Sequence, residues 1–169
     1  MVQTSVIRAA LLVALSAVFD AVIGPYLTFG LVAPNLTIIS IVVAASGLGE
    51  LQAILLGFFG GILTDALGVG VGLFGVGAIG GIVAGLLAVR VGTYQRKSVS
   101  RPVLSVAVFL SVAVYDSIKL TANGLAGFSG PSAVGFFFGG MLPDALLNGL
   151  LAYIIGVKLF KLVRIKGGR

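Results

Sequence analysis

Apolar residues fill six long segments of the chain, and short stretches of Gly, Pro and polar residues separate them. The apolar segments lie at residues 5–24, 34–47, 51–67, 72–92, 102–123 and 133–163. Apolar runs of near-spanning length that recur from end to end predict transmembrane helices. The second and third segments are short, and the stretch from Gly47 to Glu50 divides them, so we expect a tight helical hairpin. The pattern predicts one helical domain over residues 1–169 that crosses the membrane about six times.

The sixth segment is too long for one crossing and contains Pro143. A break near Pro143 would place Asp144 in the first turn of a new helix, where the helix dipole favours an anion. We therefore expect Asp144 to cap that helix. A kink and a re-entrant half-helix both fit the pattern.

The composition agrees with a polytopic membrane protein. Hydrophobic residues make up 59% of the 169 residues and charged residues 9%, whereas a soluble domain carries about a quarter charged residues. Cys, His and Trp are absent from the sequence, which excludes disulfides, thiolate chemistry, His-ligated metals and imidazole acid–base catalysis. We expect an all-α polytopic integral membrane protein with no cofactor and no metal site.

Positive charge predicts the orientation of the helices. With a cytoplasmic N-terminus, every Lys and Arg except Lys119 falls on the inner side: Arg8, Arg90, Arg96, Lys97, Arg101, Lys158, Lys161, Arg164, Lys166 and Arg169. This distribution follows the positive-inside rule, so we expect both termini in the cytoplasm. Residues 164–169 then form a basic cytoplasmic tail that anchors the topology, with anionic lipid as a secondary partner. The net charge of +6 is explained by this orientation, without nucleic acid.

Small residues recur at helical spacing in three of the segments. They are Ala10, Ala14, Ala17, Ala21 and Gly24 in the first, Gly57 and Gly61 in the third, and Gly77, Gly81 and Gly85 in the fourth. Such stripes let helix backbones approach closely in lipid. Packing within the bundle is the favoured interpretation of each stripe. The first-helix stripe is the best candidate for a contact with another protein, because a terminal helix can lie at the edge of a bundle.

Four carboxyl groups fall within the apolar segments, all in the outer half of the expected bundle. They are Asp20, Asp65, Asp116 and Asp144, with Lys119 and Asn148 at a similar depth. A charge at mid-membrane costs about 2.5–3.5 kcal/mol on insertion scales, so such groups face the interior or find partners. The inner halves of the helices have no matching acidic residue, which argues against a proton relay across the membrane.

The partners of these carboxyl groups are open to alternatives. Asp116 and Lys119 are three residues apart on one helix and can satisfy each other. Asp20 and Asp65 lie near the C-terminal ends of their helices, where the dipole disfavours an anion. They can be protonated, hydrated, hydrogen-bonded to backbone amides or hydroxyls, or paired with a cation of another protein. Within the chain, Lys119 is the predicted partner of Asp65, because it is the only outer cation.

Several short motifs together resemble a known family. They are Pro34-Asn35-Leu36 before an apolar helix, Gly57-Phe58 to Gly60-Gly61-Ile62-Leu63-Thr64-Asp65, Tyr115-Asp116 in the fifth helix, and Leu142-Pro143 to Leu147-Asn148 in the last. The combination resembles the MreD family of integral-membrane rod shape-determining proteins, from about residue 30 to about residue 160. Asp144 after Pro143 and the glycine run after Asp65 have no place in the family pattern.

The resemblance implies a non-enzymatic scaffold in the bacterial cytoplasmic membrane. Proteins of the MreD family act in the cell-elongation complex for peptidoglycan synthesis, with the single-pass protein MreC as partner. They are linked to a RodA-type glycosyltransferase with its penicillin-binding transpeptidase, and indirectly to MreB filaments. On this basis Asp65, Asp116 and Asn148 would shape the surface that receives the transmembrane helix of the partner. Structural pairing of Asp65 within the bundle is an equal alternative.

A rival function comes from a second similarity. The helical bundle of the MreD family is also similar to the substrate-binding subunits of energy-coupling-factor vitamin transporters. In those subunits an alanine stripe on the first helix docks the coupling subunit, a role that Ala10, Ala14, Ala17 and Ala21 would fit. However, a vitamin site needs an outward-facing pocket with polar and aromatic groups, and the outer half of this chain offers mainly carboxyl groups. A cationic vitamin such as thiamine would suit them best.

Overall fold

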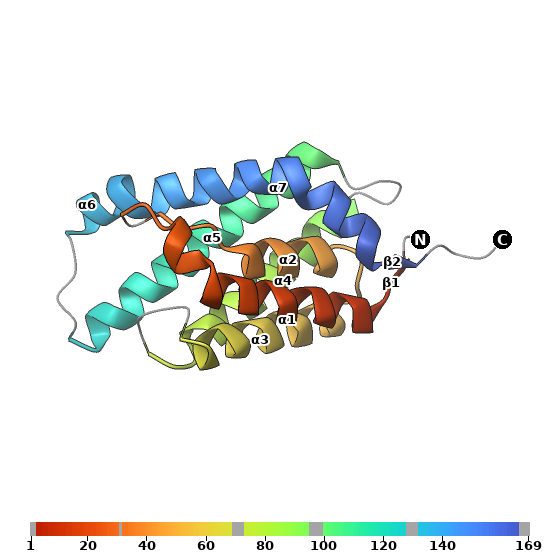
Figure 1. The fold of residues 1–169 in the computed structure, drawn as a ribbon, viewed down its shortest axis with the longest axis horizontal. Coiled ribbons are helices and arrows are strands. Elements are labelled where there is room, and N and C mark those ends of the chain that lie inside the picture. The colour runs from red at the N-terminus through yellow and green to blue at the C-terminus, as the bar shows by residue number, and fades with distance from the viewer. Residues whose placement is uncertain (1–2, 31, 69–72, 95–99, 128–131, 166–169) are drawn as a thin grey trace.

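The protein is a bundle of helices in the computed structural model, which describes residues 3–30, 32–68, 73–94, 100–127 and 132–165 (Figure 1). Its helical elements are α1 (Val6–Val22), the 3₁₀ helix η1 (Gly24–Leu27), α2 (Leu36–Ala45), α3 (Glu50–Ala66), α4 (Val76–Tyr94), α5 (Arg101–Leu125), α6 (Ala133–Phe136), the π-helix η2 (Phe137–Met141) and α7 (Leu142–Val163). The expected all-helical class is confirmed. Apart from the short 3₁₀ helix η1, the described residues form six helical segments when α6, η2 and α7 are counted as one.

Helix α2 lies at the centre of the bundle. Every residue from Thr37 to Ala45 is buried, and α2 contacts α1, α3, α4, α5 and α7. Its ten residues span only about 15 Å, half the thickness of a bilayer core. The predicted element at 34–47 is therefore shorter than expected. Non-helical backbone at membrane depth persists only where protein groups satisfy it, which makes the chain before α2 the place to look for buried polar contacts.

The glycine motifs of α3 and α4 meet each other. A Cβ atom on Gly57 would overlap the carbonyl oxygen of Gly81, and one on Gly61 would overlap that of Gly77. A Cβ atom on Gly85 would likewise overlap the carbonyl oxygen of Ala53. Because the two backbones touch over this length, α3 and α4 form the closest helix pair of the bundle, and the small residues serve packing within the chain.

The outward face of α1 differs from the one that the alanine stripe predicts. Ala17 is fully buried, and Ala10, Ala14 and Ala21 are half-buried. The most exposed side chains of α1 are large and aliphatic: Ile7, Leu11, Leu15, Val18 and Val22. These branched side chains suit contact with lipid, whereas the small residues turn toward the bundle. This burial agrees with the favoured interpretation of the stripe, packing within the bundle, and a contact of its half-buried alanines with another protein stays a prediction.

Helical structure continues through the position where a break near Pro143 was expected. Residues Phe137–Met141 form a π-helix, and α7 follows directly at Leu142. The 30 residues from Val134 to Val163 are thereby one apolar helix that is long enough to cross a membrane. The extra residue of the π-helical turn accommodates the chain ahead of Pro143 without interrupting the helix. The continuous helix fits a single crossing at this position, and a re-entrant half-helix is the less favoured prediction.

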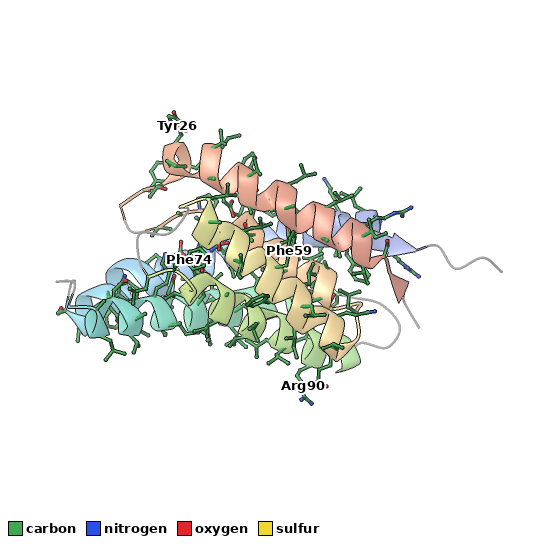
Figure 2. All side chains as sticks on the ribbon, turned by 90° about the horizontal axis from the view of Figure 1, so that it is seen from below. Tyr26, Phe59, Phe74 and Arg90 are labelled. Atoms are coloured by element: carbon green, nitrogen blue, oxygen red, sulfur yellow. The ribbon has the colours of Figure 1, made fainter. Side chains whose placement is uncertain are left out.

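Both ends of the described chain lie at one end of the bundle (Figure 1). There, two-residue strands β1 (Gln3–Thr4) and β2 (Arg164–Ile165) pair antiparallel, a contact that the apolar pattern does not predict. Figure 2 shows Arg90 in the half of the bundle nearer to these strands, and Tyr26 and Phe74 in the other half. Besides the helix Val134–Val163, helix α5 with its 25 residues is also long and apolar enough to cross a membrane. Residues 166–169 of the predicted basic tail lie outside the described part of the chain.

Candidate functional site

The carboxyl group of Asp20 holds the N-terminus of α2. Its Oδ1 accepts a hydrogen bond from the amide of Leu36 at 3.0 Å, and its Oδ2 accepts two from Thr37, from the amide at 2.8 Å and the hydroxyl at 2.7 Å. The first amides of a helix have no partner within that helix. Asp20, near the C-terminal end of α1, thus caps another helix, where the dipole favours negative charge.

Asp144 and Asn148 hold the extended chain that leads into α2. Asp144 Oδ1 accepts a hydrogen bond from the amide of Ala33 at 2.8 Å. Asn148 Oδ1 accepts one from the amide of Asn35 at 2.7 Å, while Asn148 Nδ2 donates to the carbonyl oxygens of Ala33 at 3.1 Å and Asp144 at 2.9 Å. Asn148 has no exposed surface. Asp144 lies in the first turn of α7, as predicted, but α7 has no side-chain cap, and the backbone donor to the Asp144 carboxyl group is Ala33 in the segment before α2.

Asp20, Asp144 and Asn148 together form what we name the polar clamp. They come from α1 and α7 and converge on residues 33–37, while the Asn35 side chain accepts a hydrogen bond from Ile38 N at 2.9 Å and completes the cap. A helix that spans only half of the bilayer needs such hydrogen bonds, because unpaired backbone amides and carbonyl groups in lipid raise the free energy of the fold. The clamp explains how a ten-residue helix can form the core of a membrane bundle.

Asp65 caps a different helix. Its Oδ2 accepts hydrogen bonds from the amides of Gly75 at 2.8 Å and Ala78 at 3.3 Å, and its Oδ1 accepts one from Gly77 at 3.0 Å. These amides lie at the start of α4, so Asp65 fastens the end of α3 to its neighbour. Lys119 is not its partner, and the predicted Asp65–Lys119 pair is wrong. Of the alternatives drawn from the sequence, hydrogen bonding to backbone amides is the one that the structure contains.

Lys119 instead lies beside an aromatic ring. Its ammonium group stands 5.3 Å from the centre of the Tyr115 ring, and the same ring fills the space that a side chain on Gly80 would occupy. Within the described residues, the recorded ion pair is Arg90–Glu50 at 3.4 Å, so Asp116 and Lys119 do not form the expected salt bridge. Asp116 lies near the carboxyl group of Asp144, across the α5–α7 contact.

Hydroxyl groups add further polar contacts between helices. The hydroxyl oxygens of Ser16 on α1 and Ser40 on α2 lie 2.6 Å apart, and Ser105 on α5 donates to the carbonyl oxygen of Gly149 on α7 at 2.8 Å. The apolar pattern does not predict these two pairs. The position of a single serine within an apolar segment does not show whether its side chain faces another helix or lipid.

The chemistry available to these groups is limited. Each member of the polar clamp, and Asp65 as well, is engaged by backbone donors or acceptors of the chain itself. Within the described ranges no group of three or more acidic residues is placed to hold a metal ion. The arrangement stabilises the bundle, and it brings together neither a nucleophile with a base nor a set of metal ligands.

A shallow apolar groove of about 490 Å³ runs along the outer surface of α5. Its lining residues all belong to that helix: Leu110, Ala113, Val114, Ser117, Ile118, Thr121, Ala122 and Leu125. We name it the α5 groove. The hydroxyls of Ser117 and Thr121 donate to the carbonyl oxygens of Ala113 and Ser117, each at 2.8 Å. With its hydroxyls satisfied, this surface is compatible with lipid or with another apolar helix.

Comparisons with known proteins identify the family. The family model described as rod shape-determining protein MreD matches residues 3–166, nearly the whole chain. Searches of curated proteins and of solved structures returned no match. The motifs around Asp65, Asp116 and Asn148 carried the same resemblance in the sequence. The chain belongs to the MreD family of membrane proteins and has a role in the determination of rod shape.

Proposed function

We propose that the protein is a non-enzymatic scaffold of the bacterial cell-elongation complex, and that it binds the transmembrane region of an MreC-like single-pass protein. The observation that carries the proposal is the family match over residues 3–166. The internal use of the buried polar groups supports it, because side chains engaged in holding α2 and α4 are not free to act on a substrate.

The proposed setting is the cytoplasmic membrane, with six crossings and both termini in the cytoplasm. The distribution of the described cations supports this orientation. Arg8 begins α1, Arg90 lies near the end of α4, Arg101 begins α5, and Lys158, Lys161 and Arg164 lie at the end of α7. All belong to the end of the bundle that carries both termini. The opposite end has uncharged loops, since no charged residue lies between Asp20 and Glu50 or between Lys119 and Asp144.

A vitamin-binding subunit is the less favoured function. In that role Asp20 and Asp65 would be the groups that grip a cationic solute. In many transporters the N-terminus of a half-helix holds an anionic substrate. At α2 and α4 that place is taken by an aspartate side chain of the protein itself. A solute would have to displace three hydrogen bonds at each of these carboxyl groups.

The α5 groove is the surface that we propose for the partner helix. Small and hydroxyl side chains, such as Ala113, Ser117 and Thr121, allow a second helix to approach closely. The groove residues recur at spacings of three and four over residues 110–125, which matches the contact stripe of one helix on another. Asp116 and Lys119 lie outside this stripe: Asp116 is near Asp144 of α7, and Lys119 is beside the Tyr115 ring. The α5 groove replaces the surface expected from the sequence, because Asn148 has no exposure and Asp65 is engaged at α4.

Through this partner the scaffold would contact the rest of the complex. A RodA-type glycosyltransferase, its penicillin-binding transpeptidase and, indirectly, MreB filaments are the expected components. The outer loops of the described chain are short, so contacts on the outer side would depend on the partner.

Mild detergent extraction from the native cell, followed by identification of co-purifying proteins, tests the proposal. We expect a single-pass protein with a large extracytoplasmic domain, together with wall-synthesis enzymes. As a control, the same extraction is made from cells that express a variant with Ser117→Leu, which fills the α5 groove and should release the partner while the bundle persists. Recovery of an ABC-type ATPase pair with a membrane coupling subunit would overturn the scaffold and establish the transporter subunit.

A further inference from the structure

The two chain ends form a small clasp at the positively charged end of the bundle. Strand β1 pairs with β2 so that Thr4 is opposite Arg164, and the amide of Ser5 donates to the carbonyl oxygen of Val163 at 2.9 Å. Ser5 also caps α1 through its side chain, which accepts from the amide of Arg8 at 3.4 Å. These contacts bring the beginning of α1 to the end of α7, although the two helices are at opposite ends of the sequence.

This clasp gathers cations that have no acidic neighbour. Arg8 lies in the first turn of α1, Lys161 in the last turn of α7, and Arg164 within β2, and all three are exposed. The acidic residue at this end of the bundle, Glu50, is paired with Arg90. Among the described residues no ion pair is recorded for the three clasp cations. The N-terminus of α1 adds the positive end of a helix dipole to the same place.

Apolar side chains continue from the clasp along the bundle. Ile7, next to Arg8, is 75% exposed, and Leu162, next to Lys161, is 63% exposed. Further along α1, Leu11 and Leu15 are exposed on the same side of the helix. A surface with cations at its edge and aliphatic side chains below them matches an amphipathic molecule with an anionic head and hydrocarbon tails.

We propose that the clasp is a binding site for an anionic phospholipid. The phosphate of the headgroup contacts Arg8, Lys161 and Arg164, and an acyl chain lies against Ile7 and Leu162. The lipid links the two ends of the chain, because its headgroup bridges cations of α1 and of α7. A free phosphate ion would use the same cations without the aliphatic surface, and the experiment separates these two sources of the anion.

The test is native mass spectrometry of the purified full-length protein in detergent with added phosphatidylglycerol. The site variant is Arg8→Gln with Arg164→Gln. The control variant is Arg90→Gln with Arg101→Gln, which removes the same charge from the same end of the bundle but outside the clasp. We expect the site variant to weaken retention about 25-fold, since each of the two cations that it removes contributes about fivefold near an anionic lipid surface. The control is expected to retain the lipid as the wild type does.

Three results would overturn the proposal. An equal loss in both variants would mean that net charge alone attracts the lipid. Unchanged retention in the site variant would place the lipid elsewhere. Displacement of the lipid by inorganic phosphate at equal concentration would mean that the aliphatic surface contributes nothing. Equal thermal stability of the two variants in detergent without lipid confirms that neither substitution pair has disturbed the fold.

Discussion

Asp20 accepts two hydrogen bonds from Thr37 through a single carboxyl oxygen, from the amide at 2.8 Å and from the hydroxyl at 2.7 Å. This contact joins the end of α1 to the beginning of α2, the helix around which the others pack. An acidic side chain within an apolar segment invites a search for a ligand or a proton path. In this protein its place at the start of a short buried helix gives it a structural role.

Asp20→Ala should destabilise the bundle by several kcal/mol, because it leaves the amides of Leu36 and Thr37 unpaired in an apolar interior, at about 1–3 kcal/mol for each buried group. Thermal unfolding in detergent measures the effect. Thr37→Val is the matched control: it removes only the hydroxyl bond and should cost about 1 kcal/mol. Equal stability of Asp20→Ala and the wild type would show that the clamp does not hold α2.

Asp65→Asn should lower stability by about 1–3 kcal/mol, because an amide side chain offers one acceptor oxygen to three backbone donors and places its own donors against them. Lys119→Met is the comparison, since it leaves the bonds to Gly75, Gly77 and Ala78 intact. We expect its melting temperature to lie well above that of Asp65→Asn. If Lys119→Met were the more damaging change, the pairing of Asp65 with Lys119 inferred from the sequence would have been right.

Gly81→Ala should prevent the close approach of α3 and α4, because the new methyl group would overlap the carbonyl oxygen of Gly57. Low yield and loss of a cooperative unfolding transition are the expected signs. Gly124→Ala on α5 meets no atom within 4 Å and should gain up to about 1 kcal/mol from helix propensity. The helix-pair assignment fails if both variants unfold like the wild type.

Asn148→Leu should loosen the segment before α2, because it removes the partners of Asn35 N and Ala33 O while keeping an apolar volume of similar size. Hydrogen exchange measures this directly: the amides of residues 33–37 should exchange faster, and those at the α3–α4 contact should not. A uniform increase across the bundle would indicate general unfolding and no specific clamp.

Helix positions could be predicted from the sequence because apolar length alone determines them in lipid. The predicted segment at 51–67 contains α3 almost residue for residue, and 102–123 lies within α5. The predicted second segment was longer than α2, because Pro34 and Asn35 are as compatible with a helix start as with extended chain. The π-helix η2 before Pro143 has no signal in the sequence, since its residues continue the apolar run without a change of period.

Partners of the carboxyl groups could not be predicted, because they are backbone amides of distant segments. Asp20 and Asp144 both bind the chain around α2, yet they lie at opposite ends of the sequence. An interpretation of the sequence alone pairs residues of opposite charge, and it therefore assigned Lys119 as the partner of Asp65. One signal was available: each of α2 and α4 begins in an apolar region where its first amides need an acceptor, and these aspartates are the acceptors of suitable depth.

We propose that the protein is a scaffold whose α5 groove receives the helix of a single-pass partner. Site-specific photo-crosslinking in living cells tests it most directly, with the reactive residue at Ser117 in the groove and, as a control, at Leu15 on the exposed face of α1. We expect a crosslink to a single-pass, MreC-like protein from position 117 and none from position 15. A crosslink of that partner from position 15 alone, or a transporter coupling subunit captured at either position, would contradict it.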